Sequence, residues 1–255
     1  MIDLAFSTLG VPGLPLPEVL GLAARDGYTG LELRCADGEP VGPDMPAPER
    51  RRAAAAFREA GVTPLCLASY IKIAAPGPDR PVLDALRRHL ELAADIGSSR
   101  LRVFPGGLDR PAAVRRLNQV AADARDHGVR VLVETHDSHP RGRDVAALIA
   151  DAPGTGAIWD VLHPQLAGES PLATYAALAD RLAYVQFKDV SPTRAPVPLG
   201  SGVLPLDEVG EVLARGRYRG WVSWEYEAAW FPEAAPLPTL LAAGRIWFSR
   251  LESRR

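Results

Sequence analysis

The sequence predicts a single (β/α)8 TIM barrel of the α/β class, formed by residues 1–255. Three observations support this fold. Short β-like runs alternate with amphipathic helical stretches eight times along the chain. The length of 255 residues matches the usual size of such barrels. A doubly wound sheet is disfavoured because the sequence has no GxGxxG turn, and no linker, repeat or low-complexity tract divides the chain.

The predicted strands are short apolar runs bounded by turn residues. In chain order they are 2–8, 30–34, 63–69, 100–104, 130–135, 156–160, 182–188 and 221–227. Helices cover barrel strands on the outside and side chains fill the barrel, so both faces of each strand should be apolar. Polar residues within these runs are therefore expected mainly at the C-terminal mouth, where such barrels place their active sites.

The predicted helices are the amphipathic stretches that follow each strand. In chain order they are 17–26, 48–60, 79–96, 111–127, 143–150, 171–180, 205–215 and 236–251. Several of them are followed by a glycine that suits a helix C-cap, as in the segments DGY, AGV, IGS and HGV. The helix signals therefore agree with the strand signals on one alternating architecture.

Composition excludes several classes of function. The net charge is −2 and no basic stripe is present, so a nucleic-acid partner is not expected. No apolar run reaches transmembrane length, and the first residues do not form a signal peptide, so we expect a cytoplasmic protein without membrane contact. The two cysteines suggest no disulfide framework. A homodimer is compatible with these features.

Polar side chains occur at the ends of the last four predicted strands, beginning with the segment RVLVETHD at 130–137. They are Glu134, His136, Asp160, Gln186, Lys188, Glu225 and Glu227. Within each strand these residues are two positions apart, so they share a face. Carboxylates this close repel one another and raise one another's pKa, a problem that a bound divalent cation removes.

Each of these residues also has an ordinary structural explanation. Glu134 could be an exposed loop residue, and Asp160 could cap a following helix. Glu225 and Glu227 could pair with arginines. The coincidence of carboxylates on adjacent strands favours a metal site over these separate explanations.

The segments VLVETHD, WDVLH, YVQFKD and GWVSWEYE resemble the xylose isomerase-like TIM barrels. That group includes ketose 3-epimerases, hydroxypyruvate isomerases, inosose dehydratases and endonuclease IV. The resemblance implies one divalent metal held by Glu134, Asp160, Gln186 and Glu225. Gln186 departs from the family pattern, because most members have His there, although hydroxypyruvate isomerase-like members also have Gln. An all-oxygen ligand set favours Mn²⁺ or Mg²⁺ over Zn²⁺.

The resemblance also implies the chemistry. The substrate is expected to be a small carbohydrate, namely a sugar, a sugar phosphate or a hydroxy-keto acid, that reacts through a metal-stabilised enediolate. Glu134 and Glu225 would be the catalytic acid/base pair of an isomerase or epimerase. An inosose-type dehydratase on the same scaffold and a non-catalytic carbohydrate-binding barrel remain as alternatives.

Further residues near the mouth are predicted to bind substrate. They are His136, His163, Lys188 and Arg102. Lys188 is one of only two lysines among 29 basic residues, which suggests a role for a compact amine. Glu32, Arg34 and Arg102 are charged positions inside predicted strands that could pair across the interior, and for Glu32 and Arg34 one buried ion-pair network is expected rather than catalysis. The Gly-Ser-Gly segment within 191–205 is a weak candidate for phosphate binding.

Overall fold

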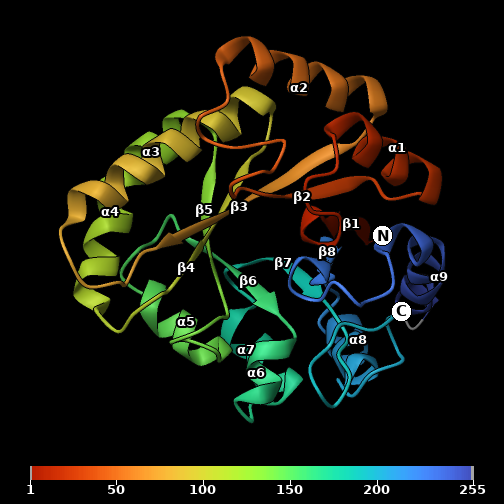
Figure 1. Cartoon of the computed structure of the whole chain (residues 1–255). Coiled ribbons are helices and arrows are strands. Elements are labelled where there is room, and N and C mark those ends of the chain that lie inside the picture. Colours follow the sequence, from red (N-terminus) through yellow and green to blue (C-terminus); the bar gives the residue numbers. More distant parts are fainter. Residues whose placement is uncertain (1, 254–255) are drawn as a thin grey trace.

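Within residues 2–253, which the computed structural model describes, eight parallel strands close into a barrel in sequential order, as Figure 1 shows. Residues 1, 254 and 255 of the predicted domain lie outside the described residues. The strands are β1 (Asp3–Ser7), β2 (Gly30–Arg34), β3 (Thr63–Lys72), β4 (Arg100–Phe104), β5 (Arg130–Glu134), β6 (Gly156–Asp160), β7 (Leu182–Phe187) and β8 (Trp221–Trp224). The predicted fold class is therefore confirmed.

Helices surround this ring of strands (Figure 1). They are α1 (Leu16–Asp26), α2 (Ala47–Ala60), α3 (Asp79–Ile96), α4 (Arg110–Asp126), α5 (Gly142–Ile149), α6 (Leu162–Leu166), α7 (Pro171–Leu178), α8 (Leu206–Arg215) and α9 (Leu241–Ser253). The expected glycine caps are present: Gly27 after α1 and Gly97 after α3 have φ of 75° and 85°, a left-handed conformation that glycine adopts without strain. None of the helices in the described part has the length and apolar composition needed to cross a bilayer.

Some predicted boundaries were wrong. The last helix begins at Leu241 instead of 236, because Pro238 is incompatible with a helix interior and the preceding turn is a 3-10 helix, Leu237–Thr239. The short helix α6 was missed, since five residues give too little periodicity to detect. Strand β8 ends at Trp224, three residues before the predicted end. These differences lie in the segments that border the C-terminal mouth.

Strand register sets the depth of the polar residues. Asp160 on β6 is paired with Gln186 on β7, and Gln186 is paired with Ser223 on β8. A small apolar cluster lies one layer deeper inside the barrel and consists of Ala5, Leu65, Cys66, Leu132, Ile158 and Tyr184. Because side chains alternate along a strand, the residues two positions after this cluster point into the same interior. The barrel interior therefore changes from apolar to polar toward the ends of β5 to β8.

Candidate active site

Four consecutive strands bring the predicted metal ligands to one place. Glu134 ends β5, Asp160 ends β6, Gln186 lies one residue before the end of β7, and Glu225 follows β8 directly. All four residues are buried, with at most 3% of their surface exposed. One carboxylate oxygen from each of Glu134, Asp160 and Glu225 lies within 4.8 Å of the other two. The structure thus gathers these side chains at a spacing that one ion could bridge.

Two buried cations lie among the carboxylates. Arg102 on β4 donates Nη1 to Glu134 Oε2 at 2.9 Å, and the same Nη1 lies 3.7 Å from Glu225 Oε1. Lys188, which follows β7 directly, places Nζ 2.7 Å from Asp160 Oδ2 and donates to Glu225 Oε2 at 2.5 Å. Repulsion between the carboxylates is therefore partly compensated by the protein itself.

The cluster keeps a negative charge after these contacts. Lys188 also donates to Glu227 at 2.5 Å, and Glu32 is connected through Gln186. Among the described residues, this network holds two cations and five carboxylates, which leaves three uncompensated negative charges when all are ionised. The carboxylates are Glu32, Glu134, Asp160, Glu225 and Glu227. Buried excess charge is unfavourable, so this donor set fits a divalent cation.

Sequence reasoning missed the role of Glu32. Its carboxylate accepts hydrogen bonds from the Gln186 amide, Nε2 to Oε2 at 3.1 Å, and from the Tyr184 hydroxyl at 2.6 Å. The expected single ion-pair network does not include both Glu32 and Arg34, because Arg34 forms an ion pair with Glu39 at 2.5 Å. Only the position of Glu32 inside an apolar strand could have indicated an interior contact. Its partners lie more than 150 residues away in the sequence.

The surroundings move the pKa values of the carboxyl groups apart. Burial raises the pKa of Asp160 to about 6, although Lys188 opposes this. Burial also raises the pKa of Glu134, against the effect of Arg102. Burial acts upward on Glu225 as well, but Lys188 and Arg102 outweigh it and lower its pKa to about 2. Glu134 is therefore better suited than Glu225 to exchange a proton near neutral pH.

The amine of Lys188 stays protonated. Burial alone would lower the pKa of Lys188, but Asp160 and Glu225 outweigh it and hold the pKa well above its ordinary value. A Schiff base requires a neutral amine that can attack a carbonyl carbon. The contacts of Lys188 therefore favour an electrostatic role.

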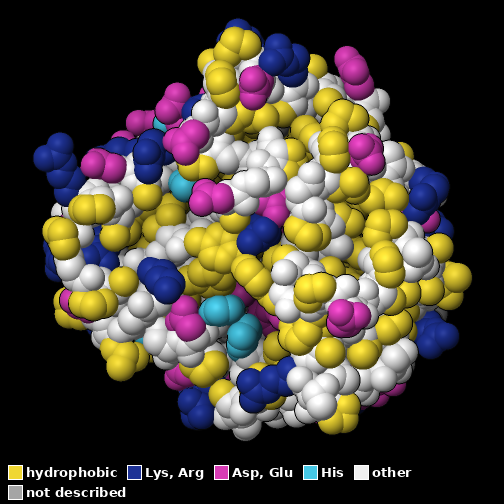
Figure 2. All heavy atoms as spheres, in the orientation of Figure 1, with side chains coloured by type: hydrophobic (Ala, Val, Ile, Leu, Met, Phe, Trp, Pro, Cys, Tyr) yellow, Lys and Arg dark blue, Asp and Glu magenta, His cyan; other side chains and the backbone are white. Residues whose placement is uncertain are grey.

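Two predicted histidines stand beside the cluster. The rings of His136 and His163 are 4.3 Å apart, and nitrogens of both lie within 4.8 Å of a Glu134 oxygen and of each other. Burial lowers the pKa of His163 to about 4, so this ring is neutral near pH 7. Figure 2 shows histidine side chains beside a hollow near the middle of the face that Figure 1 presents. Both rings are therefore placed to contact a substrate or to serve as alternative ligands.

The loop after β7 does not offer the phosphate site suggested by its Gly-Ser-Gly segment. Asp189 accepts hydrogen bonds from the backbone N–H groups of Gly200 at 3.0 Å, Gly202 at 2.8 Å and Leu204 at 3.2 Å. These N–H groups are consumed within the protein. The carboxylate of Asp189 thus fixes the loop, which sequence spacing could not reveal.

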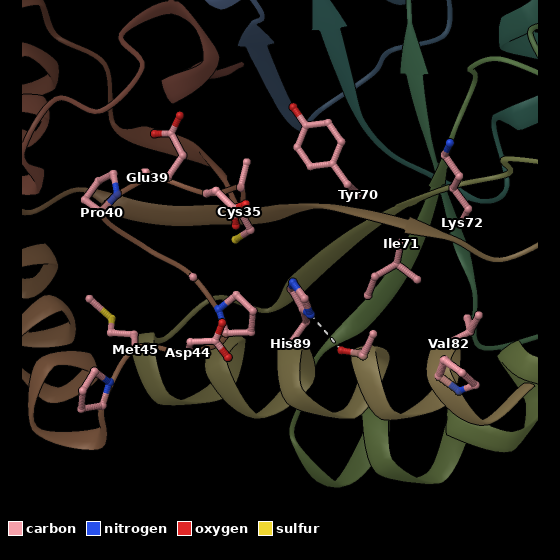
Figure 3. Close-up of a pocket in the computed structure, with 18 of the residues that line it drawn as sticks. Cys35, Glu39, Pro40, Asp44, Met45, Tyr70, Ile71, Lys72, Val82 and His89 are labelled. Atoms are coloured by element: carbon pink, nitrogen blue, oxygen red, sulfur yellow. Dashed lines mark hydrogen bonds between the residues drawn. The ribbon is translucent and has the colours of Figure 1, made fainter.

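A cavity of about 760 Å³ lies between the segment after β2, the end of β3 and helix α3. Figure 3 shows Tyr70 and Lys72 on one side of β3, and Ile71 on the other side, toward α3. His89 of α3 contacts the carbonyl of Ala85 at 2.8 Å. Among the described residues, the lining of this cavity includes none of the carboxylates that surround Lys188, so it is separate from the candidate metal site.

Comparison with known proteins agrees with this geometry. The chain matches the family model described as "Xylose isomerase-like TIM barrel" over residues 20–251. A protein of Streptomyces coelicolor named "Putative hydroxypyruvate isomerase" is 32% identical over 268 residues, and the alignment covers 91% of this chain and 92% of that protein.

Solved structures share the architecture. The D-psicose 3-epimerase of Clostridium cellulolyticum H10, solved with D-tagatose, aligns with a TM-score of 0.81 at 14% identity and covers 98% of each chain. The IOLI protein, solved with a zinc atom, aligns with a TM-score of 0.77 at 15% identity and covers 95% of each chain. At this level of identity the likeness establishes the fold alone.

Proposed function

Because this chain belongs to the xylose isomerase-like TIM barrel family, we propose that it is a divalent-metal-dependent isomerase of a small hydroxy-keto acid. The name of the Streptomyces relative, which is 32% identical over 91% of this chain, supports this substrate class. Small sugars and sugar phosphates are the next substrates to test. Epimerisation is the related reaction, because it differs only in where the removed proton returns.

The observation that carries the proposal is the buried group formed by Glu134, Asp160 and Glu225, whose oxygens lie within 4.8 Å of one another. We assign the ion to these three residues and to Gln186. Carboxylate and amide oxygens are hard ligands, which favours Mn²⁺ or Mg²⁺ over Zn²⁺. When bound, such an ion supplies Lewis acidity that stabilises negative charge on the substrate oxygens.

The side chains of this protein supply the proton transfers. Glu134 removes a proton from the carbon that bears the hydroxyl group. Glu225, which is charged before the reaction, takes the hydroxyl proton and delivers it to the neighbouring carbon. Glu134 then passes its proton to the former carbonyl oxygen, so that a hydroxy ketone becomes a hydroxy aldehyde and both carboxylates are regenerated. Burial raises the pKa of Glu134, which makes its carboxylate a stronger base than an exposed one and suits the first step.

The cations and histidines orient the reactants. Arg102 contacts Glu134 and Lys188 contacts Glu225, and both cations favour the charged form of these carboxylates; a substrate carboxylate would add a further anion for them to bind. Neutral His163 can exchange a hydrogen bond with a substrate hydroxyl, and His136 lies against it. These four residues are our proposed substrate-binding set.

The test is proton exchange with solvent. Protein loaded with MnCl₂ is incubated in D₂O with hydroxypyruvate, a ketose panel and an inosose, and products are followed by NMR. The proposal predicts deuterium at the carbon next to the carbonyl and formation of the isomeric aldehyde from hydroxypyruvate. Loss of water from the inosose would instead identify a dehydratase. Ligand binding without any exchange would identify a non-catalytic carbohydrate-binding protein.

A further inference from the structure

We infer that Glu32 is a positioning residue that orients the Gln186 amide, so that the amide oxygen is the atom left to bind a metal ion. This inference rests on the proposed function, because it requires an ion at the site formed by Glu134, Asp160, Gln186 and Glu225. Glu32 itself is not a ligand in this arrangement. It acts across the barrel interior, since it lies on β2 and Gln186 lies on β7, three strands away around the ring.

The hydrogen bonds of Gln186 account for both of its N–H groups. Its Nε2 donates to Glu225 Oε1 at 3.0 Å and to the two oxygens of Glu32 at 3.2 Å and 3.1 Å. Its Oε1 is buried and has no hydrogen-bond partner among the described residues. A buried amide oxygen without a partner is unfavourable, and a metal ion is a partner that can satisfy it.

The reverse orientation of the amide is disfavoured. Turning the amide over would place Oε1 against the carboxylates of Glu32 and Glu225, where oxygen would face oxygen without a hydrogen. It would also direct the N–H groups toward the position of the ion, and an N–H group cannot bind a cation. The two carboxylates therefore select one of two orientations that are otherwise similar in shape.

Glu32 is itself held in place. Its side chain is fully buried, and the Tyr184 hydroxyl donates to its Oε2 at 2.6 Å. Oε2 of Glu32 accepts from both the Tyr184 hydroxyl and the Gln186 amide, and Oε1 accepts from the Gln186 amide. A glutamine at position 32 replaces one of these acceptor oxygens by an NH₂ group, so a donor would stand where both oxygens now present acceptors to Tyr184 and Gln186.

The test measures Mn²⁺ affinity by titration calorimetry with MnCl₂ on the full chain. We expect Glu32→Gln to weaken binding about 10–100-fold, as is typical when a residue that orients a ligand is lost. Glu227→Gln is the matched control, because it removes a carboxylate of the same network that does not contact Gln186. We expect this control to weaken binding by less than threefold. Thermal unfolding of each variant without metal establishes that it is folded.

A second background separates orientation from charge. Gln186→Glu replaces the amide by a carboxylate with oxygen at both ends, so orientation no longer matters. In this background Glu32→Gln should leave Mn²⁺ affinity unchanged or increase it, because Gln at 32 can donate to the new carboxylate. The loss of Mn²⁺ affinity caused by Glu32→Gln should therefore be absent in the Gln186→Glu background.

The outcomes are distinct. Equal Mn²⁺ affinity of the original chain and Glu32→Gln would overturn the role of Glu32 and leave the proposed function standing. The same loss in both backgrounds, or an equal loss in Glu227→Gln, would also overturn it, because charge alone would then explain the effect. Absence of Mn²⁺ binding by the original chain would overturn both proposals.

Discussion

Replacing Lys188 by methionine removes the main cation of the carboxylate cluster without changing the length of the side chain greatly. Lys188 is 3% exposed, and its Nζ lies 2.7 Å from Asp160 and 2.5 Å from both Glu225 and Glu227. The variant leaves buried Asp160 and Glu225, and half-buried Glu227, without this counter-ion. We therefore expect a large loss of stability in metal-free protein at pH 8.

The magnitude follows from the burial of the pair. Breaking a buried ion pair by removing one partner costs roughly 3–5 kcal/mol. For a chain of 255 residues, an unfolding entropy of about 2.1 cal/mol/K per residue converts this loss into a decrease in Tm of roughly 6–9 °C. Because the carboxyl groups can take up protons in acid, the decrease should shrink toward pH 5.

The second lysine provides the control. Lys72 ends β3 and is exposed, so Lys72→Met should change the free energy of unfolding by no more than about 0.5 kcal/mol. Both variants are followed by thermal unfolding at pH 5 and pH 8. A decrease for Lys188→Met no larger than that for Lys72→Met, or one independent of pH, would refute the reasoning. Addition of MnCl₂ should recover part of the loss, since the ion offsets the same charge.

Three further predictions concern the site and its loop. With saturating Mn²⁺, Glu134→Gln and Glu225→Gln should each reduce turnover of the verified substrate at least a hundredfold. Exchange of the substrate proton into D₂O should be lost most completely in Glu134→Gln. Recovery of full turnover with excess metal would show that both residues are ligands only. Asp189→Asn should lower the Tm and increase proteolysis of the loop after β7, because four backbone N–H groups, those of Val190, Gly200, Gly202 and Leu204, lose a charged acceptor. The exposed Asp180→Asn should do neither, and an intact loop in Asp189→Asn would contradict this. Burial raises the pKa of Glu32 to about 7 in the folded chain, so its contribution to stability is complete below pH 4.5 and is lost as the pH rises through 7. The free energy of unfolding of metal-free Glu32→Gln should therefore rise by up to roughly 3 kcal/mol, relative to that of the original chain, between pH 4.5 and 8. A difference that stays constant with pH in denaturant titrations would argue against a raised pKa.

Much of this site could be predicted because it depends on local pattern. Glu134 and Asp160 interrupt apolar strands at their C-terminal ends, and parallel strands in sequential order place such residues side by side. The alternation of side chains then assigns Gln186 to the same interior. These arguments require only strand positions and strand order.

Contacts across the barrel could not be predicted in this way. Glu32 bonds to Tyr184 across 152 residues of sequence, and no local pattern identifies that partner. The long side chains of Arg102 and Lys188 extend into the carboxylate cluster, so that residues expected to bind substrate also neutralise the protein's own charges. Which partner a buried charge selects depends on three-dimensional packing rather than on spacing.

The central claim is that one divalent ion binds at the ends of β5 to β8, and a crystal soaked in MnCl₂ tests it most directly. Anomalous scattering from manganese locates the ion without assumptions about its ligands. We predict one peak per chain, bound by carboxylate oxygens of Glu134, Asp160 and Glu225 and by the amide oxygen of Gln186. No peak at this position, or a peak bound by the two histidines beside Glu134 in place of the other three residues, would contradict the account.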